Sequence, residues 1–163
     1  MLLRTGAFAD IAALQELESA ARTRYLDLQN LAFVAAAPAI AADRLQVGHV
    51  TIAEQEDRLL GFVLTSLVDA QLYIANISVA PGASSHGIGD ALMRATMQRA
   101  GTLGLGALTL TTFRAPRWNA PWFGRHGFTP IPDEAVGPGL REILQRQARS
   151  VDPATRVALW RRI

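Results

Sequence analysis

The stretch ISVAPGASSHGIGDALM, residues 77–93, decides the fold. It starts as an apolar strand, passes through a proline and three glycines, and continues with the spacing of a helix whose buried side carries Ile88, Ala91 and Leu92. A glycine-rich loop between a strand and a helix can bind phosphate through backbone N–H groups and the positive end of the helix dipole. The same glycines can also serve only to turn the chain from strand to helix.

The residues present exclude one common phosphate loop and disfavour another. The sequence has no lysine, whereas a Walker loop needs Gly-Lys-Ser/Thr. A dinucleotide fingerprint needs G-x-G-x-x-G, but Gly87-Ile88-Gly89 is followed by Leu92 where the third glycine belongs. Two alternatives therefore remain, a pyrophosphate loop without lysine and a purely structural turn.

Hydrophobic periodicity around this loop predicts a mixed α/β domain around one sheet. Strands are expected at residues 2–5, 47–54, 59–67, 71–79, 107–113, 128–131 and 155–163. Helices are expected at residues 8–24, 28–37, 87–100, 119–126 and 139–149. The strands between residues 47 and 79 read as an antiparallel meander, and the helix at 87–100 predicts a parallel pair formed by the strands on either side of it. We expect a single domain over residues 1–163.

The composition excludes several classes of function. The 163 residues include no cysteine, so a disulfide framework, a thiolate metal site and a cysteine nucleophile are excluded. The three histidines show no metal-ligand spacing, so no metal is expected. All 16 basic residues are arginine, but the 14 acidic residues leave a net charge of only +2. This small net charge disfavours a nucleic-acid partner. No stretch has the layout of a signal peptide or a transmembrane helix, so we expect a cytoplasmic protein without a membrane partner.

The flanks of the loop resemble the cofactor-binding segment of the GNAT superfamily of N-acetyltransferases. That family's pattern is an apolar strand ending in Val-x-Pro, followed by Gln/Arg-x-x-Gly-x-Gly/Ala at the start of a helix. Val79 and Pro81 match the strand end, and Gly87 and Gly89 match the loop, whereas Ser84 stands where the family has glutamine or arginine. WNAPWFGRHGF, residues 118–128, resembles the family's last cofactor element, and LRTGAFADIAALQELE, residues 3–18, is similar to its first strand and helix. The resemblance covers nearly the whole chain in the expected order.

The resemblance implies an acyl-CoA N-acyltransferase fold, with a mostly antiparallel sheet that is splayed between its fourth and fifth strands and flanked by helices. It implies acetyl-CoA as cofactor, with the pantetheine arm beside the fourth strand and the pyrophosphate on the glycine loop. The implied cofactor-binding residues are Ile77, Ser78, Val79, Ser84, Ser85, His86, Gly87, Ile88, Gly89, Asp90, Asn119, Trp122 and Phe123. The backbone N–H of Val79 is the implied donor to the oxyanion that develops during acyl transfer.

Two residues depart from the family's catalytic pattern. Asn76 lies on the strand where many members carry the glutamate that deprotonates the amine, and asparagine is a poor base. Phe123 occupies the place of the tyrosine that acts as the acid, and phenylalanine cannot donate a proton. This second loss is tolerable, because a thiol has a pKa near ~8.5 and leaves readily as a thiolate. The catalytic base is therefore unknown.

Other side chains are candidates for the open roles. One candidate base is His49, for which the alternative is a solvated or packed histidine. A second is His86, for which the alternative is a phosphate contact. A third is Glu54, for which the alternative is an exposed charge at a strand end. His126 is better explained by stabilisation of a helix end.

The resemblance also implies an acceptor site between the first two expected helices. Tyr25, Asp27 and Phe33 are the candidate residues there, and ordinary helix packing is the alternative. The predicted function is acetyl transfer to an unidentified amine, on a small molecule or peptide, by direct transfer in a ternary complex. The alternative is a catalytically degenerate CoA-binding sensor or interaction module, and a nucleotide-binding protein without CoA is a weaker third hypothesis. The oligomeric state stays open, with a homodimer as one candidate.

Overall fold

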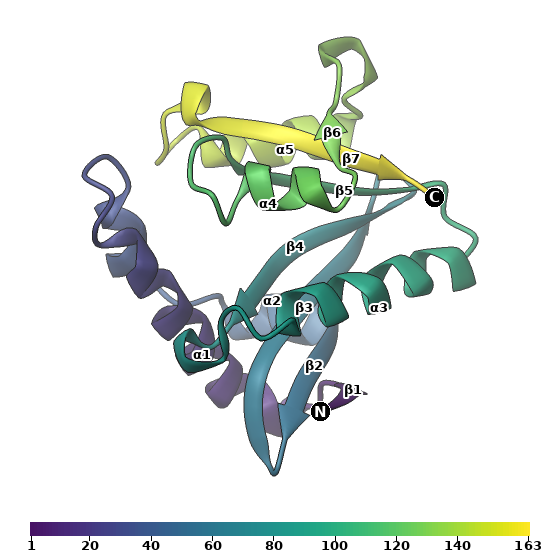
Figure 1. The fold of residues 1–163 in the computed structure, drawn as a ribbon. Coiled ribbons are helices and arrows are strands. Elements are labelled where there is room, and N and C mark those ends of the chain that lie inside the picture. The colour runs from purple at the N-terminus through teal and green to yellow at the C-terminus, as the bar shows by residue number, and fades with distance from the viewer. The chain divides into compact units, whose positions relative to one another are not determined.

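The computed structural model describes all 163 residues and contains one seven-stranded sheet in the order β1-β2-β3-β4-β5-β7-β6 (Figure 1). β4 and β5 run parallel, whereas β1/β2, β2/β3, β5/β7 and β6/β7 are antiparallel pairs. The expected mixed α/β class and the parallel pair around a crossover helix are therefore confirmed. The strands are β1 (Leu2–Thr5), β2 (His49–Gln55), β3 (Arg58–Val68), β4 (Gln71–Val79), β5 (Ala107–Phe113), β6 (Thr129–Pro130) and β7 (Arg156–Arg162). The α-helices are α1 (Ile11–Arg22), α2 (Ala42–Val47), α3 (Ile88–Thr102), α4 (Ala120–Arg125) and α5 (Pro138–Gln147).

The chain divides into two compact units, which are described separately. The first unit comprises residues 1–65 and 76–96, and the second comprises residues 66–75 and 97–163. β3, β4 and α3 each contribute residues to both units. None of the helices combines the length and the apolar character that crossing a membrane requires.

The core of the first unit is built from α1, β2, β3 and the start of α3. Its most deeply buried side chains, each at most 2% exposed, include Leu14, Ile52, Phe62, Leu64 and Leu92. The start of β2 shows the expected alternation, because Val50 and Ile52 are buried while the residues on either side of Val50 are partly exposed. This alternation directs one face of β2 toward the core.

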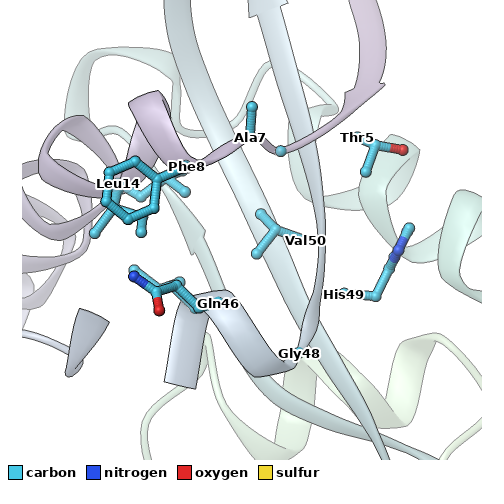
Figure 2. A pocket seen from close by; sticks show the side chains of 11 residues that line it. Thr5, Ala7, Phe8, Leu14, Gln46, Gly48, His49 and Val50 are labelled. Carbon is cyan, nitrogen blue, oxygen red and sulfur yellow. The ribbon is translucent and has the colours of Figure 1, made fainter. Parts of the chain in front are cut away.

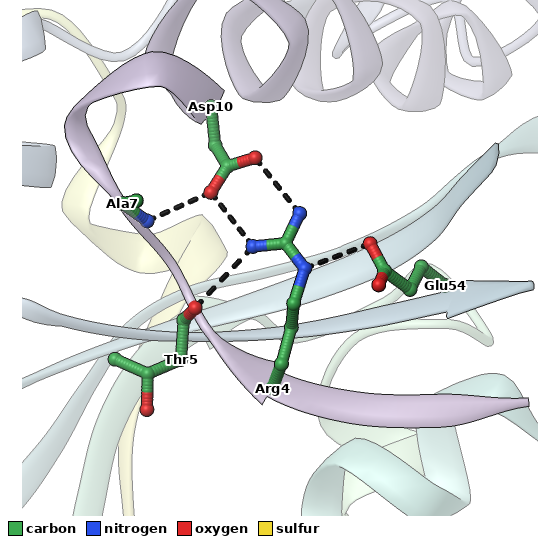
Figure 3. Close-up of polar contacts among 5 residues, drawn as sticks. All are labelled: Arg4, Thr5, Ala7, Asp10 and Glu54. Carbon is green, nitrogen blue, oxygen red and sulfur yellow. Dashed lines mark hydrogen bonds and ion pairs between the residues drawn. The ribbon is translucent and has the colours of Figure 1, made fainter. Parts of the chain in front are cut away.

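An ion-pair network ties the edge strand β1 to the rest of the first unit (Figure 3). Arg4 donates to both carboxylate oxygens of Asp10 at 2.8 Å and to Oε2 of Glu54 on β2 at 2.8 Å. The Asp10 carboxylate also accepts the N–H of Ala7 at 2.7 Å. The hydrogen bonds from Arg4 and, to a smaller extent, from Ala7 lower the pKa of Asp10 below its ordinary value, and they outweigh the opposing effect of burial. The bond from Arg4 engages the carboxylate of Glu54. This engagement does not favour Glu54 as the catalytic base.

In the second unit, α5 packs on one face of the sheet. Tyr73 on β4, Leu140 on α5 and Ala158 on β7 form a buried cluster. The carboxylate of Asp69, in the turn between β3 and β4, accepts the N–H groups of Gly139 and Leu140 at 2.8 and 2.9 Å. Asp69 therefore caps the N-terminus of α5, where a negative charge also favours the helix dipole.

The segment after α1 differs from the prediction. In place of the helix expected at residues 28–37, the structure has consecutive tight turns, and only Ala32–Ala36 forms a 3-10 helix. The turns close with short-range bonds, from Leu31 N to Leu28 O at 2.9 Å and from Val34 N to Leu31 O at 3.0 Å. The carbonyl oxygen of Val34 in this segment also accepts a hydrogen bond from a side chain of α1, as described below.

Helix α2 is a second difference from the prediction. The sequence pattern predicts a strand that begins at Val47, but this residue ends α2 and is 89% exposed. The helix has only six residues, which is too short for its apolar spacing to stand out in the sequence.

Candidate functional site

The loop after β4, in the first unit, is a series of tight turns. Ala80 N donates to Leu60 O at 2.9 Å, which holds the end of β4 beside β3. Pro81–Ala83 form a single 3-10 turn. Ser85 and Gly87 then adopt left-handed backbone conformations, with φ of 67° and 75°. Backbone turns of this kind direct N–H groups into a concavity that suits an anion.

The N-terminus of α3 follows directly and lies against β3. The first hydrogen bond of the helix runs from Ala91 N to Gly87 O at 3.0 Å. Ile88 and Leu92 pack over Gly61 of β3, where a Cβ would lie 3.3 Å from each of them and 2.7 Å from the carbonyl oxygen of Ser78. The missing side chain at Gly61 therefore allows both the helix start and the end of β4 to approach β3 closely.

The residues of this loop fit a phosphate-bearing group. A Cβ at Gly87 would meet no atom within 4 Å, so the chain leaves the space over the turn open. The N–H groups of the first helical turn have no partner within the helix, and their positive charge favours an anion. The exposed ring of His86 is oriented by its Nδ1, which lies 2.7 Å from Ser84 O. Because a carbonyl oxygen can only accept, Nδ1 carries the hydrogen of this bond.

The strand before the loop offers no carboxylate. The hydroxyl of Ser78, which is 8% exposed, donates to Oδ1 of Asn76 at 2.8 Å. This bond orients the Asn76 amide and leaves no proton acceptor of ordinary basicity at the place where the resemblance implies a glutamate.

A pocket of about 190 Å³ opens elsewhere in the first unit (Figure 2). Phe8, Leu14 and Val50 provide apolar side chains around it, and the ring of His49 lies on the other side of β2 from Val50. Nε2 of His49 is 3.4 Å from Oγ1 of Thr51. Of the three candidate bases, only His49 belongs to the lining of this pocket. Its full lining is Thr5, Gly6, Ala7, Phe8, Ile11, Leu14, Leu45, Gln46, Gly48, His49 and Val50.

The three acceptor candidates lie in the turns that follow α1, in different surroundings. Tyr25 is 8% exposed and belongs to the core of the first unit, which agrees with ordinary helix packing as the alternative to an acceptor contact. Asp27 is exposed, and Phe33 is 49% exposed although it is large and apolar. Only Asp27 and Phe33 are therefore accessible to an acceptor.

Sequence reasoning missed the side chains that hold this segment. Gln15 donates to Ile40 O at 2.8 Å, Glu18 accepts the N–H of Ile40 at 3.2 Å, and Arg22 donates to Val34 O at 3.2 Å. Glu18 and Arg22 also form an ion pair at 3.0 Å, with side chains 8% and 12% exposed. Their spacing of three and four residues places them on one side of α1. That polar stripe is the signal that could have found them.

The element that begins at Asn119 belongs to the second unit. Asn119 O accepts the N–H groups of Trp122 and Phe123 at 2.9 and 3.1 Å, which places Asn119 at the N-cap position of α4. Phe123 is 5% exposed and packs edge-on against Trp122 and Phe128, with ring centroids 5.0 and 5.6 Å apart. Gly127, with φ of 82°, ends the helix. Phe123 thus has a packing role in this unit.

Comparison with known protein families identifies the chain. The family model described as an acetyltransferase (GNAT) domain matches residues 46–130, from α2 to β6. The chain belongs to the GNAT family. It is therefore an acyl-CoA N-acyltransferase of the N-acetyltransferase class, and its cofactor is acetyl-CoA.

Solved structures confirm the GNAT fold. The Mycobacterium tuberculosis protein Rv2747, in complex with CoA, is 22% identical with a TM-score of 0.65, over 100% of this chain and 99% of that one. Ribosomal-protein-alanine N-acetyltransferase from Brucella melitensis is 15% identical with a TM-score of 0.68, over 100% of both chains. N-acetylglutamate synthase from Neisseria gonorrhoeae is 17% identical with a TM-score of 0.72, and 99% of this chain matches 35% of that protein. At these identities the likeness shows the fold alone.

Proposed function

We propose that this GNAT enzyme transfers the acetyl group directly to an amine within a ternary complex. The observation that carries the placement of the site is the left-handed turn at Ser85 and Gly87, between β4 and the start of α3. The proposed cofactor residues of the first unit are Ile77, Ser78 and Val79 on the strand and Ser84, Ser85, His86, Gly87, Ile88, Gly89 and Asp90 in the loop. Those of the second unit are Asn119, Trp122 and Phe123.

The chemistry demanded of the protein is modest. Acetyl-CoA supplies a thioester whose carbonyl carbon bonds to the amine nitrogen while its sulfur leaves with the electron pair of the C–S bond. The backbone N–H of Val79 is proposed to donate to the carbonyl oxygen as negative charge develops there. Asn76 takes no proton, so the amine attacks in its neutral form, and the proton that its nitrogen loses on becoming an amide passes to water or to the departing thiolate. Phe123 cannot protonate the sulfur, and no acid is needed for a thiolate leaving group.

The acceptor is proposed to bind beside the turns that follow α1. Asp27 and Phe33 are exposed there, while Tyr25 is buried and supports the shape of the segment. The neighbours of the same fold carry names that refer to glutamate and to a ribosomal-protein alanine. We therefore propose an amine on a small molecule or on a protein.

The test is release of the CoA thiol over a panel of amines, amino acids, aminoglycosides and peptides. Release above the rate of acetyl-CoA hydrolysis, together with saturable acetyl-CoA binding in calorimetry, is the expected result. Tight binding without release across the panel would favour the sensor hypothesis, which the absence of a carboxylate at Asn76 and of a hydroxyl at Phe123 motivates. A lack of acetyl-CoA binding at millimolar concentration would overturn the placement of the site.

A further inference from the structure

The proposed pyrophosphate loop has no cationic side chain of its own at the position where the GNAT pattern has arginine or glutamine. Ser84 occupies that position, and its hydroxyl lies 3.4 Å from the carbonyl oxygen of Ala80, to which it donates. His86 is the candidate for a side-chain cation in the loop, and its Nδ1 already donates to Ser84 O at 2.7 Å. The loop therefore supplies no permanently charged cation to the phosphates, so such a charge must come from another element.

Arg58 brings a guanidinium to this loop from a different strand. It is the first residue of β3 and is exposed, and its Nη2 lies 3.8 Å from the position that a Cβ on Gly82 would take. Three residues further along β3, Gly61 passes beneath Ile88 and Leu92 of α3. Two separate contacts thus place the start of β3 beside both the turn at Gly82 and the first turn of α3, and all these residues belong to the first unit.

The guanidinium of Arg58 is available for a ligand. Arg58 takes part in no ion pair or side-chain hydrogen bond within the chain, although Glu56 and Asp57 precede it in the turn between β2 and β3. Both of these residues have left-handed backbones, with φ of 51° and 59°. An arginine presents several N–H donors in a plane that matches two phosphate oxygens, and a charge-assisted bond of this kind is stronger than one between neutral groups.

We propose that Arg58 binds the pyrophosphate of CoA and supplies the charge that Ser84 does not. This inference deepens the proposed function and rests on it, because it assigns a new side chain to the same site. The family pattern places the cation inside the loop, whereas here it comes from a position 26 residues before Ser84 and is brought to the loop by the pairing of β3 with β4. The sequence motif alone does not contain this residue.

Calorimetry on the full chain tests the assignment with the variants Arg58→Gln and Arg58→Lys. The matched control is Arg94→Gln, an exposed arginine on α3 in the same unit. Arg58→Gln is expected to weaken CoA binding about 15- to 100-fold, within the range of one charge-assisted hydrogen bond. Arg58→Lys should restore part of the affinity, Arg94→Gln should bind CoA normally, and all three should keep the melting temperature of the parent.

Two further measurements separate the assignment from a merely structural effect. Dephospho-CoA lacks the 3′-phosphate but keeps the pyrophosphate, so Arg58→Gln should weaken its binding by the same factor. The dependence of the CoA dissociation constant on NaCl concentration should also be shallower in Arg58→Gln, because one phosphate contact is lost. Unchanged CoA affinity in Arg58→Gln, or a loss that disappears with dephospho-CoA, would overturn the inference while leaving the proposed function intact. A parent protein that binds no CoA would overturn both.

Discussion

At the scale of single residues, Gly87 carries a conformational requirement that can be tested. Its φ of 75° is left-handed, and a Cβ there meets no atom, so substitution is penalised by the backbone and not by a clash. Gly87→Ala should lower the free energy of unfolding by about 1 kcal/mol. It should also weaken acetyl-CoA binding, because a methyl group then projects from the turn proposed to contact the pyrophosphate. Thermal unfolding and calorimetry measure the two effects.

Gly101 provides the matched control. It lies in the last turn of α3, a Cβ there also meets nothing within 4 Å, and its φ is not left-handed. Gly101→Ala should therefore raise the free energy of unfolding by up to about 1 kcal/mol, since alanine favours a helix, and leave acetyl-CoA binding unchanged. If Gly87→Ala behaves in the same way as Gly101→Ala, the left-handed turn is not required.

At the scale of elements, α1 and the turns after it form one structure through Glu18. Removing this carboxylate leaves Nε of Arg22 and the N–H of Ile40 without their partner in a buried place. Glu18→Ala should therefore lower the free energy of unfolding by about 3 kcal/mol, at the lower end of the cost of breaking a buried ion pair. Urea unfolding measures this loss, and faster hydrogen exchange at Ile40 would locate it. The exposed neighbour Glu16 is the control, and Glu16→Ala should change stability by less than about 0.5 kcal/mol.

The network that joins β1 to β2 should make the stability of the first unit depend on pH. Arg4 holds the pKa of Asp10 below its ordinary value, so the folded state binds that proton less readily than the unfolded chain does. The contribution of Asp10 is then complete above its unfolded pKa, near 3.9, and is lost as the pH falls through the lower folded value. The difference in unfolding free energy between the parent and Asp10→Asn should therefore shrink between pH 6 and pH 2 in denaturant titrations.

A matched variant tests whether this shrinkage belongs to the network. Asp57 is exposed and forms no ion pair, so Asp57→Asn should show no comparable convergence with the parent at low pH. Equal convergence in both variants would mean that the charge of the whole chain, and not the bond from Arg4, governs the acid response.

The elements that periodicity predicted correctly are those whose backbone groups are paired in a regular helix or sheet. The strands of the meander, α3, β5 and α5 all lie within a few residues of their expected positions. The helix predicted at 28–37 is replaced by short turns, and side chains of α1 bind the chain within and just after it, at Val34 and Ile40. No local pattern of alanines and leucines can report such bonds.

At the scale of the whole molecule, the candidate site combines contiguous motifs with contacts between residues far apart in the sequence. The loop from Ser84 to Asp90 and the element from Asn119 could be proposed as cofactor-binding from the sequence, because each is a contiguous motif. The engagement of Glu54 by Arg4, 50 residues away, could not. Nor could the proximity of Arg58 to Gly82, since both depend on how strands pair. The family was recognisable from the sequence, whereas the proposal of Arg58 as a ligand contact required the structure.

The distribution of charge over the molecule leads to a final prediction. The net charge of +2 conceals an asymmetry, because the first unit has six arginines and nine acidic residues while the second has ten and five. Acetyl-CoA carries three phosphate groups, so the second unit should accelerate its association, and salt should screen this effect. The association rate, followed by tryptophan fluorescence in stopped-flow mixing, should fall several-fold between low and high NaCl concentration.

Two double variants with the same change in net charge distinguish distribution from total charge. Arg114→Gln/Arg117→Gln removes two exposed arginines from the second unit, and Arg44→Gln/Arg94→Gln removes two from the first. The first double variant should slow association at low salt and flatten its salt dependence, whereas the second should resemble the parent. Equal slowing in both double variants would show that the net charge attracts the cofactor and that the position of the arginines does not matter.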